Sequence, residues 1–380
     1  MRAQNRDMQS DISLHGDRVH ARTLVRDAWQ RRTRRWLVRR AAGDVAPVDA
    51  FEPLPRRGIH RVLVARVSHT LGNTLLITPL IREIERAYPG AEIDVVTRSA
   101  VADAIFGAFD RVRTIFRLPN HGVSSPHRVA ATLRSLRARS YDLAIDPGLL
   151  SMSDRMYVRA AKARWKIGYA TKAGGGLTQA IAAPVNLRHV GKLPVYLLRA
   201  ARSDAACDAY PGLDIALSAA ERAWGRTMLD ELVPGAGPVV GLFTSATGKK
   251  DLGAAWWQRF AAEYTRAIPE ARVLEIVPLG GHSILERDGS TYYSTDVRRL
   301  AAVISATSRF VAADCGVMHL ACAAGAPTLG LFRGTQIPEW GPYGLHDLAF
   351  DVTAMSPENV ADVLCADPAA GDPVTARRQA

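Results

Sequence analysis

Cysteine is scarce in this 380-residue chain, which contains only Cys207, Cys315, Cys322 and Cys365. No two of them form a C-x-x-C pair, so the sequence provides neither a disulfide framework nor a cysteine-based zinc site. The ten histidines show no H-x-x-x-H spacing. We therefore expect no metal site.

Long apolar runs are also missing. No stretch approaches the ~18 consecutive apolar residues that a transmembrane helix needs. The N-terminal region lacks the short apolar core of a secretory signal. With 48% hydrophobic and 23% charged residues, the chain has the composition of a globular protein, and we expect it to be cytoplasmic.

Negative charge is underrepresented, since the formal net charge is +12. Residues 1–57 hold 13 arginines against 7 acidic residues, which is half of that excess. Within them, Arg22 to Arg40 places two tryptophans near one helical face and arginine over much of the rest. Such a helix suits the surface of an anionic membrane, nonspecific nucleic-acid binding or a solvated arm. Nothing else resembles a nucleic-acid-binding module, so no nucleic-acid partner is expected.

After Pro55, apolar runs bounded by turn residues alternate with segments of helical period. This pattern is typical of βα units and a parallel sheet. In the first half we expect strands at 61–67, 91–98, 111–118, 141–147 and 165–170, and helices at 73–88, 99–108, 126–139, 151–164 and 190–205.

The pattern becomes irregular at 171–237 and then starts again. We expect strands at 238–246, 271–278, 308–315 and 326–332, and helices at 254–267, 296–306, 316–325 and 357–365. The predicted fold is α/β, with two doubly wound Rossmann-like domains whose ligands bind at the carboxyl ends of the strands. The predicted divisions are a basic arm (1–57), a first domain (58–205), a linker (206–237), a second domain (238–365) and a mobile tail (366–380).

The segment ADCGVMHLACAAGAPTLGLFRGTQIPEWGPYG, from Ala313 to Gly344, is the most informative. A predicted strand ends at Asp314, Gly316 opens a helix, and His319 follows one turn later. A helix N-terminus suits a diphosphate, His319 offers a donor to a phosphate oxygen, and Asp314 suits sugar hydroxyls. However, Asp is also a common helix cap and a lone histidine is often structural, so the residues alone leave both interpretations open.

This segment resembles the motif D-x-G-x-x-H-L-A-A-A-x-G-x-P-x-x-x-L-F-G-x-T of glycosyltransferase family 9, the ADP-heptose:lipopolysaccharide heptosyltransferases. The stretch RVSHTLGNTLLITPL, from Arg66 to Leu80, is similar to the family's R-x-S-x-x-G-D-x-L-x-T-P-L. The resemblance extends over about residues 60–350 and leaves the arginine-rich arm unexplained.

The resemblance implies a GT-B fold, with the acceptor on the first domain and the nucleotide-sugar on the second. It also implies an inverting transfer that needs no metal or cofactor. Asp314, Gly316 and His319 would then contact the donor. Thr244, Ser245 and Lys249 in FTSATGKK are similar to the family's phosphate loop, although Lys250 is an alternative to Lys249. A lysine there would offset the charge that builds on the leaving diphosphate.

Two positions depart from the family pattern. Asn73 stands where the family has its catalytic aspartate, and an amide cannot accept a proton from a hydroxyl. Loss of a general base typically costs ~10²–10⁴-fold in rate. His282, in VPLGGH, replaces a glutamate thought to contact the nucleoside, so the identity of the donor is less well defined.

Several residues are candidates to replace the missing base. His69 lies in the same loop as Asn73 and has a pKa suited to base catalysis near neutrality. Asp146 ends a predicted strand, and His121 lies in the polar loop PNHGVSSPH. The sequence does not choose among these three.

Arginines in the first half suit an acceptor rich in carboxylate and phosphate. They are Arg66, Arg98, Arg128 and Arg155. Single surface arginines are usually just solvated, so we assign acceptor binding only to Arg66 and Ser68, which lie within the recognised motif.

Together these features predict an inverting glycosyltransferase, peripheral on the inner membrane, that moves heptose from ADP-heptose to a lipopolysaccharide core or other anionic surface glycan. His282 motivates one alternative, the same fold with another nucleotide-sugar. Asn73 motivates another, a sugar-nucleotide-binding protein without catalysis.

Overall fold

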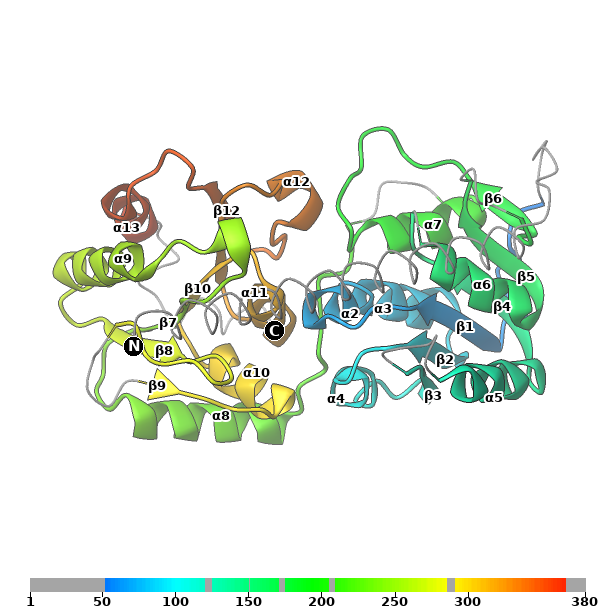
Figure 1. The fold of residues 1–380 in the computed structure, drawn as a ribbon, viewed down its shortest axis with the longest axis horizontal. Coiled ribbons are helices and arrows are strands. Elements are labelled where there is room, and N and C mark those ends of the chain that lie inside the picture. Colours follow the sequence, from blue (N-terminus) through cyan, green and yellow to red (C-terminus); the bar gives the residue numbers. More distant parts are fainter. Residues whose placement is uncertain are drawn as a thin grey trace, which may run out of the picture.

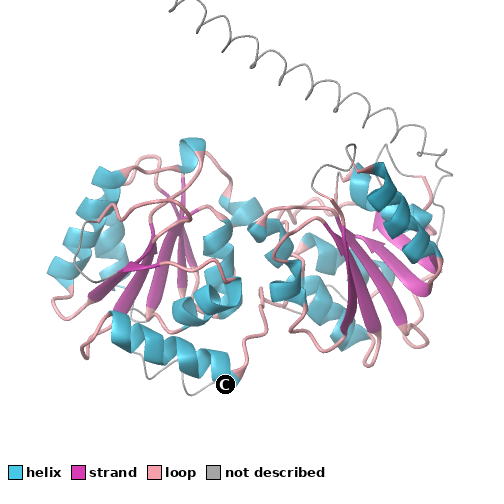
Figure 2. Cartoon of the chain, turned by 60° about the horizontal axis from the view of Figure 1, so that its bottom comes forward, coloured by secondary structure: helices cyan, strands magenta, loops and turns pink. Residues whose placement is uncertain are grey.

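The computed structural model describes residues 52–119, 125–149, 151–170, 175–204, 209–285 and 291–366. These residues form two α/β domains that lie side by side, each built on one parallel sheet with helices on both faces (Figures 1 and 2). Residues 1–51 of the predicted arm and 367–380 of the predicted tail lie outside the described residues.

The first domain contains a six-stranded parallel sheet in the order β3-β2-β1-β4-β5-β6. Its strands are β1 (Arg61–Arg66), β2 (Glu92–Thr97), β3 (Val112–Arg117), β4 (Ser140–Asp146), β5 (Lys162–Tyr169) and β6 (Gln179–Ile181). The helices that accompany them are α2 (Leu71–Leu75), α3 (Thr78–Ala87), α4 (Ala102–Phe106), α5 (Pro126–Arg137), α6 (Met152–Ala160) and α7 (Leu193–Ala201).

The second domain repeats this arrangement, with its strands in the order β12-β11-β10-β7-β8-β9. Its strands are β7 (Val239–Phe243), β8 (Arg272–Ile276), β9 (Thr291–Tyr292), β10 (Arg309–Ala313), β11 (Thr328–Phe332) and β12 (Leu348–Asp351). Its helices are α8 (Ala219–Leu232), α9 (Ala254–Ala267), α10 (Val297–Ser305), α11 (Gly316–Ala324), α12 (Ile337–Trp340) and α13 (Pro357–Ala366), with a single 3₁₀ turn at Gly248–Lys250. Counted along the chain, both sheets follow the order 3-2-1-4-5-6, which is that of a Rossmann fold.

The central strands are apolar because both faces of each sheet are covered. β7 and β10 are buried along their full lengths, and the four middle residues of β1 are buried as well. Continuous burial of this kind is expected for a parallel sheet between two layers of helices. Therefore the apolar runs of the sequence correctly located these strands.

The two domains touch through α2 and α11, which lie next to each other in the centre of the molecule (Figure 1). A β-carbon added to Gly316 would lie 3.2 Å from Cβ of Leu71 and 3.3 Å from the backbone nitrogen of Gly72. Glycine at 316 therefore permits this close approach. Since α2 follows β1 and α11 follows β10, the carboxyl-terminal edges of the two sheets are opposed.

Arg298, on α10, ties the domains together at a second point. Its guanidinium donates to the carbonyl of Ala104 in the first domain (2.9 Å) and to the carbonyls of Ile215 (3.0 Å) and Ala216 (3.0 Å) in the connecting segment. It also forms an ion pair with Glu221 of α8, at 2.5 Å. One side chain thus joins three segments.

The two-domain α/β fold is confirmed, but the segment predicted as a linker contains more structure than expected. α8 has a capping box between Ser218 and Glu221 and packs against α10 of the second domain. The short elements β6, β9, β12 and α12 were also not predicted. In the part of the chain that the structure describes, no helix is both long and apolar enough to cross a membrane.

Candidate active site

The loop that follows β1 holds Asn73 in a fixed orientation. Its Oδ1 accepts a hydrogen bond from Arg66 Nη2 (3.1 Å), and its Nδ2 donates to Thr70 Oγ1 (2.9 Å). Because a guanidinium has no acceptor, the amide oxygen must face Arg66. Thr70 also caps α2 by accepting from the backbone N–H of Asn73. The first-domain side of the site is therefore well ordered around an amide.

Asp154, which the sequence reasoning missed, supports this loop from behind. Its side chain is only 1% exposed, its Oδ1 accepts from the backbone N–H of Val67 (2.7 Å), and its Oδ2 lies 3.7 Å from Arg66 Nη1. The capping of α6 by Ser151 marks a helix start in the sequence, but no local pattern reveals a contact with Val67.

On the second domain, Asp314 directly follows β10 and is buried. Its Oδ2 accepts from Lys250 Nζ at 2.7 Å. Lys249, which the spacing favoured for the phosphate loop, is exposed, and its backbone carbonyl accepts from Arg333. The geometry thus places Lys250, the alternative lysine, beside the acid at the start of α11.

His319 lies one turn into α11 and is buried against the first domain. A β-carbon added to Gly72 would be only 2.8 Å from its Cδ2. Burial lowers the pKa of His319 to about 4, although Asp314 opposes that change. The imidazole is therefore neutral at pH 7, and one of its ring nitrogens is a hydrogen-bond donor.

Thr244, directly after β7, is held by Glu275, a second residue that the sequence reasoning missed. The buried carboxylate of Glu275 accepts from Thr244 Oγ1 (2.9 Å) and Ser283 Oγ (2.5 Å). It also accepts from the backbone N–H groups of residues 284 and 285. Ser245 follows Thr244 and is half-buried. Glu275 thus fixes the loop after β8 to the predicted phosphate loop.

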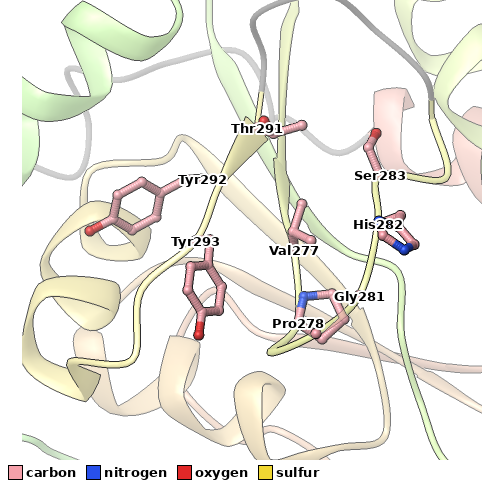
Figure 3. A pocket seen from close by; sticks show the side chains of 9 residues that line it. Val277, Pro278, Gly281, His282, Ser283, Thr291, Tyr292 and Tyr293 are labelled. Carbon is pink, nitrogen blue, oxygen red and sulfur yellow. The ribbon is translucent and has the colours of Figure 1, made fainter.

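An open cavity of about 490 Å³ lies beside β9 and beyond the end of β8. Figure 3 shows two chain segments lining it, one with Thr291, Tyr292 and Tyr293 and the other with Val277, Pro278, His282 and neighbouring residues. His282 is exposed at this cavity. Two aromatic rings beside a small cavity suit a flat organic group.

The remaining candidates fall into separate environments. His69 is exposed in the loop before α2, where the Ser68 carbonyl accepts from the backbone N–H of Arg98. Asp146 is buried and accepts from Arg155 Nε at 2.5 Å. Burial raises the pKa of Asp146, while the Arg155 guanidinium opposes that rise. The Asp146 side chain is fully buried beside Arg155, where an acceptor hydroxyl cannot reach it. Arg128 is exposed on α5.

His121 and the segment Arg22–Arg40, which the sequence predicts to be helical, lie outside the described residues. No cluster of three or more His, Cys, Asp or Glu side chains able to hold a metal occurs within the described ranges. Metal independence remains a prediction.

The arrangement of the two domains defines the structural class of the protein. Two opposed Rossmann-like domains, with polar groups gathered where their carboxyl edges meet, form a GT-B architecture. Residues 294–361, which contain most of the recognised motif, match the family described as glycosyltransferase family 9 (heptosyltransferase). The resemblance found in the sequence is therefore confirmed.

The solved structures that share this fold include the following three. The chain is 16% identical to a family 9 glycosyl transferase from Veillonella parvula, with a TM-score of 0.66, covering 78% of this chain and 87% of that one. It is 17% identical to the E. coli heptosyltransferase WaaC determined with ADP, with a TM-score of 0.64 and coverage of 80% and 98%. The E. coli ADP-heptose lps heptosyltransferase II is 16% identical, with a TM-score of 0.62 and coverage of 80% and 97%. No curated protein matches in a sequence search.

Proposed function

We propose that this protein transfers heptose from ADP-heptose to a surface-glycan acceptor of the lipopolysaccharide core type. The observation that carries the proposal is the contact of His319, on the helix that follows the Lys250–Asp314 pair, with Gly72 in the Asn73 loop of the first domain. The family match and the heptosyltransferase-like fold support sugar transfer in general.

The donor diphosphate would lie at the start of α11. Lys250 would offset the charge of the leaving group, and neutral His319 would donate to a phosphate oxygen. Thr244, held by Glu275, would line the same side. The cavity lined by Tyr292 and Tyr293 is large enough for a nucleoside base. ADP and an ADP-heptose analogue were present in the WaaC structures, which supports an adenine donor here.

Isothermal titration with ADP-heptose, ADP, GDP and UDP tests this assignment. We expect the adenine compounds to bind and His319→Ala to weaken their binding, because the variant removes a buried hydrogen-bond donor. Tighter binding of GDP or UDP would keep the fold and change the donor, as the His282 substitution allows. If His319→Ala left the affinity for the donor unchanged, the assignment of the start of α11 as the donor site would be wrong.

A sugar-nucleotide-binding protein without turnover is the second candidate, and Asn73 favours it. An enzyme releases nucleoside diphosphate and forms a glycosylated product, whereas a binder forms a complex only. Measuring ADP release from ADP-heptose in the presence of acceptor separates the two.

Membrane contact through Arg22–Arg40, with the protein cytoplasmic and peripheral, is a separate part of the proposal. It rests on the arginine and tryptophan pattern of the sequence. Deleting residues 1–50 should reduce sedimentation with vesicles that contain anionic lipid. Equal sedimentation of the full chain and the truncated chain would remove this proposal.

A further inference from the structure

Position 73 presents hydrogen-bond donors and no base. The Oδ1 of Asn73 is occupied by Arg66, and one of the two Nδ2 hydrogens is donated to Thr70. The side-chain amide then has one N–H left to donate. Its oxygen has one lone pair left, but that oxygen already faces the Arg66 cation. A hydroxyl placed here would find no group to take its proton.

Arg66 adds positive charge at the same place. Its side chain is 17% exposed, and its Nη1 lies 3.7 Å from the buried carboxylate of Asp154. Its Nε is buried and has no hydrogen-bond partner among the described residues. That buried Nε is out of reach of a ligand, but the two Nη atoms carry four N–H groups, of which one is donated to Asn73, so donor capacity remains on them. Asp154 and Asn73 fix the plane of the guanidinium.

Apart from His69, the acids and imidazoles described near this loop are buried or already paired. Asp146 pairs with Arg155, and Asp314 pairs with Lys250. His189 accepts from the backbone N–H of residue 191 at Nδ1, so its Nε2 donates to the carbonyl of residue 341. The lowered pKa of His319 makes it a weak base. His69, exposed in the same loop, is the remaining rival and becomes an outcome of the test.

We propose that the acceptor group bound at this loop is an oxygen that is already anionic, a phosphate or a carboxylate. Arg66 and the Asn73 amide would bind this oxyanion, which needs no general base. The inference rests on the proposed function, because it assumes a nucleotide-sugar on the second domain.

The reaction balances without a proton transfer. The acceptor oxygen forms a bond to the anomeric carbon of the sugar as the bond from that carbon to the diphosphate oxygen breaks. The electron pair of the broken bond stays on the diphosphate, whose added charge lies beside Lys250. The products are a glycosyl phosphate or a glycosyl ester, and a nucleoside diphosphate.

The test offers the full-length protein ADP-heptose with one of three small acceptors, inorganic phosphate, acetate or glycerol. Titration with ADP-heptose is done first. If the donor does not bind, the proposed function is wrong. If it binds, the transfer products test this inference. With donor bound, we expect mass spectrometry to find heptosyl phosphate, heptosyl acetate or both, and little heptosyl glycerol. The phosphate and acetate arms separate the two kinds of oxyanion.

Asn73→Asp is the matched variant, since it keeps the shape of the side chain and adds a negative charge. We expect it to bind ADP as the unaltered protein does and to lose transfer to the anions by roughly tenfold or more, through repulsion between like charges. It should gain transfer to glycerol, because a carboxylate accepts a proton.

Two results would overturn the inference. One is transfer to glycerol but not to either anion by the unaltered protein, which would indicate a working base such as His69. The other is donor binding with no anion product at all.

Discussion

Gly72 of the first domain lies directly against the imidazole of His319 in the second, since a β-carbon at position 72 would be 2.8 Å from Cδ2 of the ring. His319 is buried, so the ring has little room to move away. The absence of a side chain at position 72 therefore sets how closely the Asn73 loop approaches the start of α11. Glycine instead of alanine at position 72 thus determines the distance between the Asn73 loop of the first domain and α11 of the second.

Gly72→Ala should consequently separate α2 from α11. Overpacking of this kind typically costs about 1–3 kcal/mol, and we expect a loss of that size in the free energy of unfolding in urea. Gly212→Ala is the control, because a β-carbon there meets no atom within 4 Å. Equal losses in the two variants would show that the contact with His319 is not responsible.

The two neighbouring lysines should differ in their effect on donor binding. Lys250 contacts the buried Asp314, whereas Lys249 is exposed. A hydrogen bond to a charged group contributes about 1.5–3 kcal/mol, so Lys250→Ala should weaken ADP binding by roughly tenfold or more. Lys249→Ala should change it little. Titration of both variants with ADP checks this. A larger loss of ADP affinity in Lys249→Ala than in Lys250→Ala would support Lys249, which the sequence spacing favoured.

Acid should destabilise the protein partly through His189 and His319. Burial lowers the pKa of each from 6.5 to about 4. Between these values the unfolded chain binds more protons than the folded one, so stability is present above pH 6.5 and is lost as the pH falls toward 4. Each histidine can account for up to about 3 kcal/mol of this loss.

His319→Gln should therefore show a shallower fall in the free energy of unfolding than the unaltered protein over that pH range. Urea unfolding at several pH values measures it. Identical slopes would mean that His319 is protonated in the folded state.

Removing the charge of Asp154 should be costly. Leaving one partner of a buried ion pair alone typically costs 3–5 kcal/mol, and Asp154→Asn would leave Arg66 without its carboxylate. Asp103→Asn is the control, since Asp103 pairs with Arg117 at the surface, where such pairs contribute about 0–1 kcal/mol. A loss for Asp154→Asn no larger than for Asp103→Asn would contradict the role given to Asp154.

The fold could be predicted from sequence because the central strands are buried on both faces, so β7 and β10 read as continuous apolar runs. α8 was missed, although Ser218 and Glu221 carry a capping box, because proline and glycine on either side suggested a linker. The residues of the recognised motifs could be named, but the groups that hold them could not. Asp154 binds Val67 across 87 residues of sequence, and Glu275 gathers donors from two separate loops, contacts that no local pattern encodes.

Arg298 affects how the two domains unfold. Its guanidinium holds the carbonyl of Ala104, the connecting segment at Ile215 and Ala216, and the carboxylate of Glu221. Ala216 has a φ of 50°, an unfavourable conformation for a residue with a β-carbon. Neither domain can unfold without releasing this guanidinium and the backbone it holds. The two sheets are thereby linked into one cooperative unit, and a calorimetric scan should show a single melting transition where two separate cores would give two.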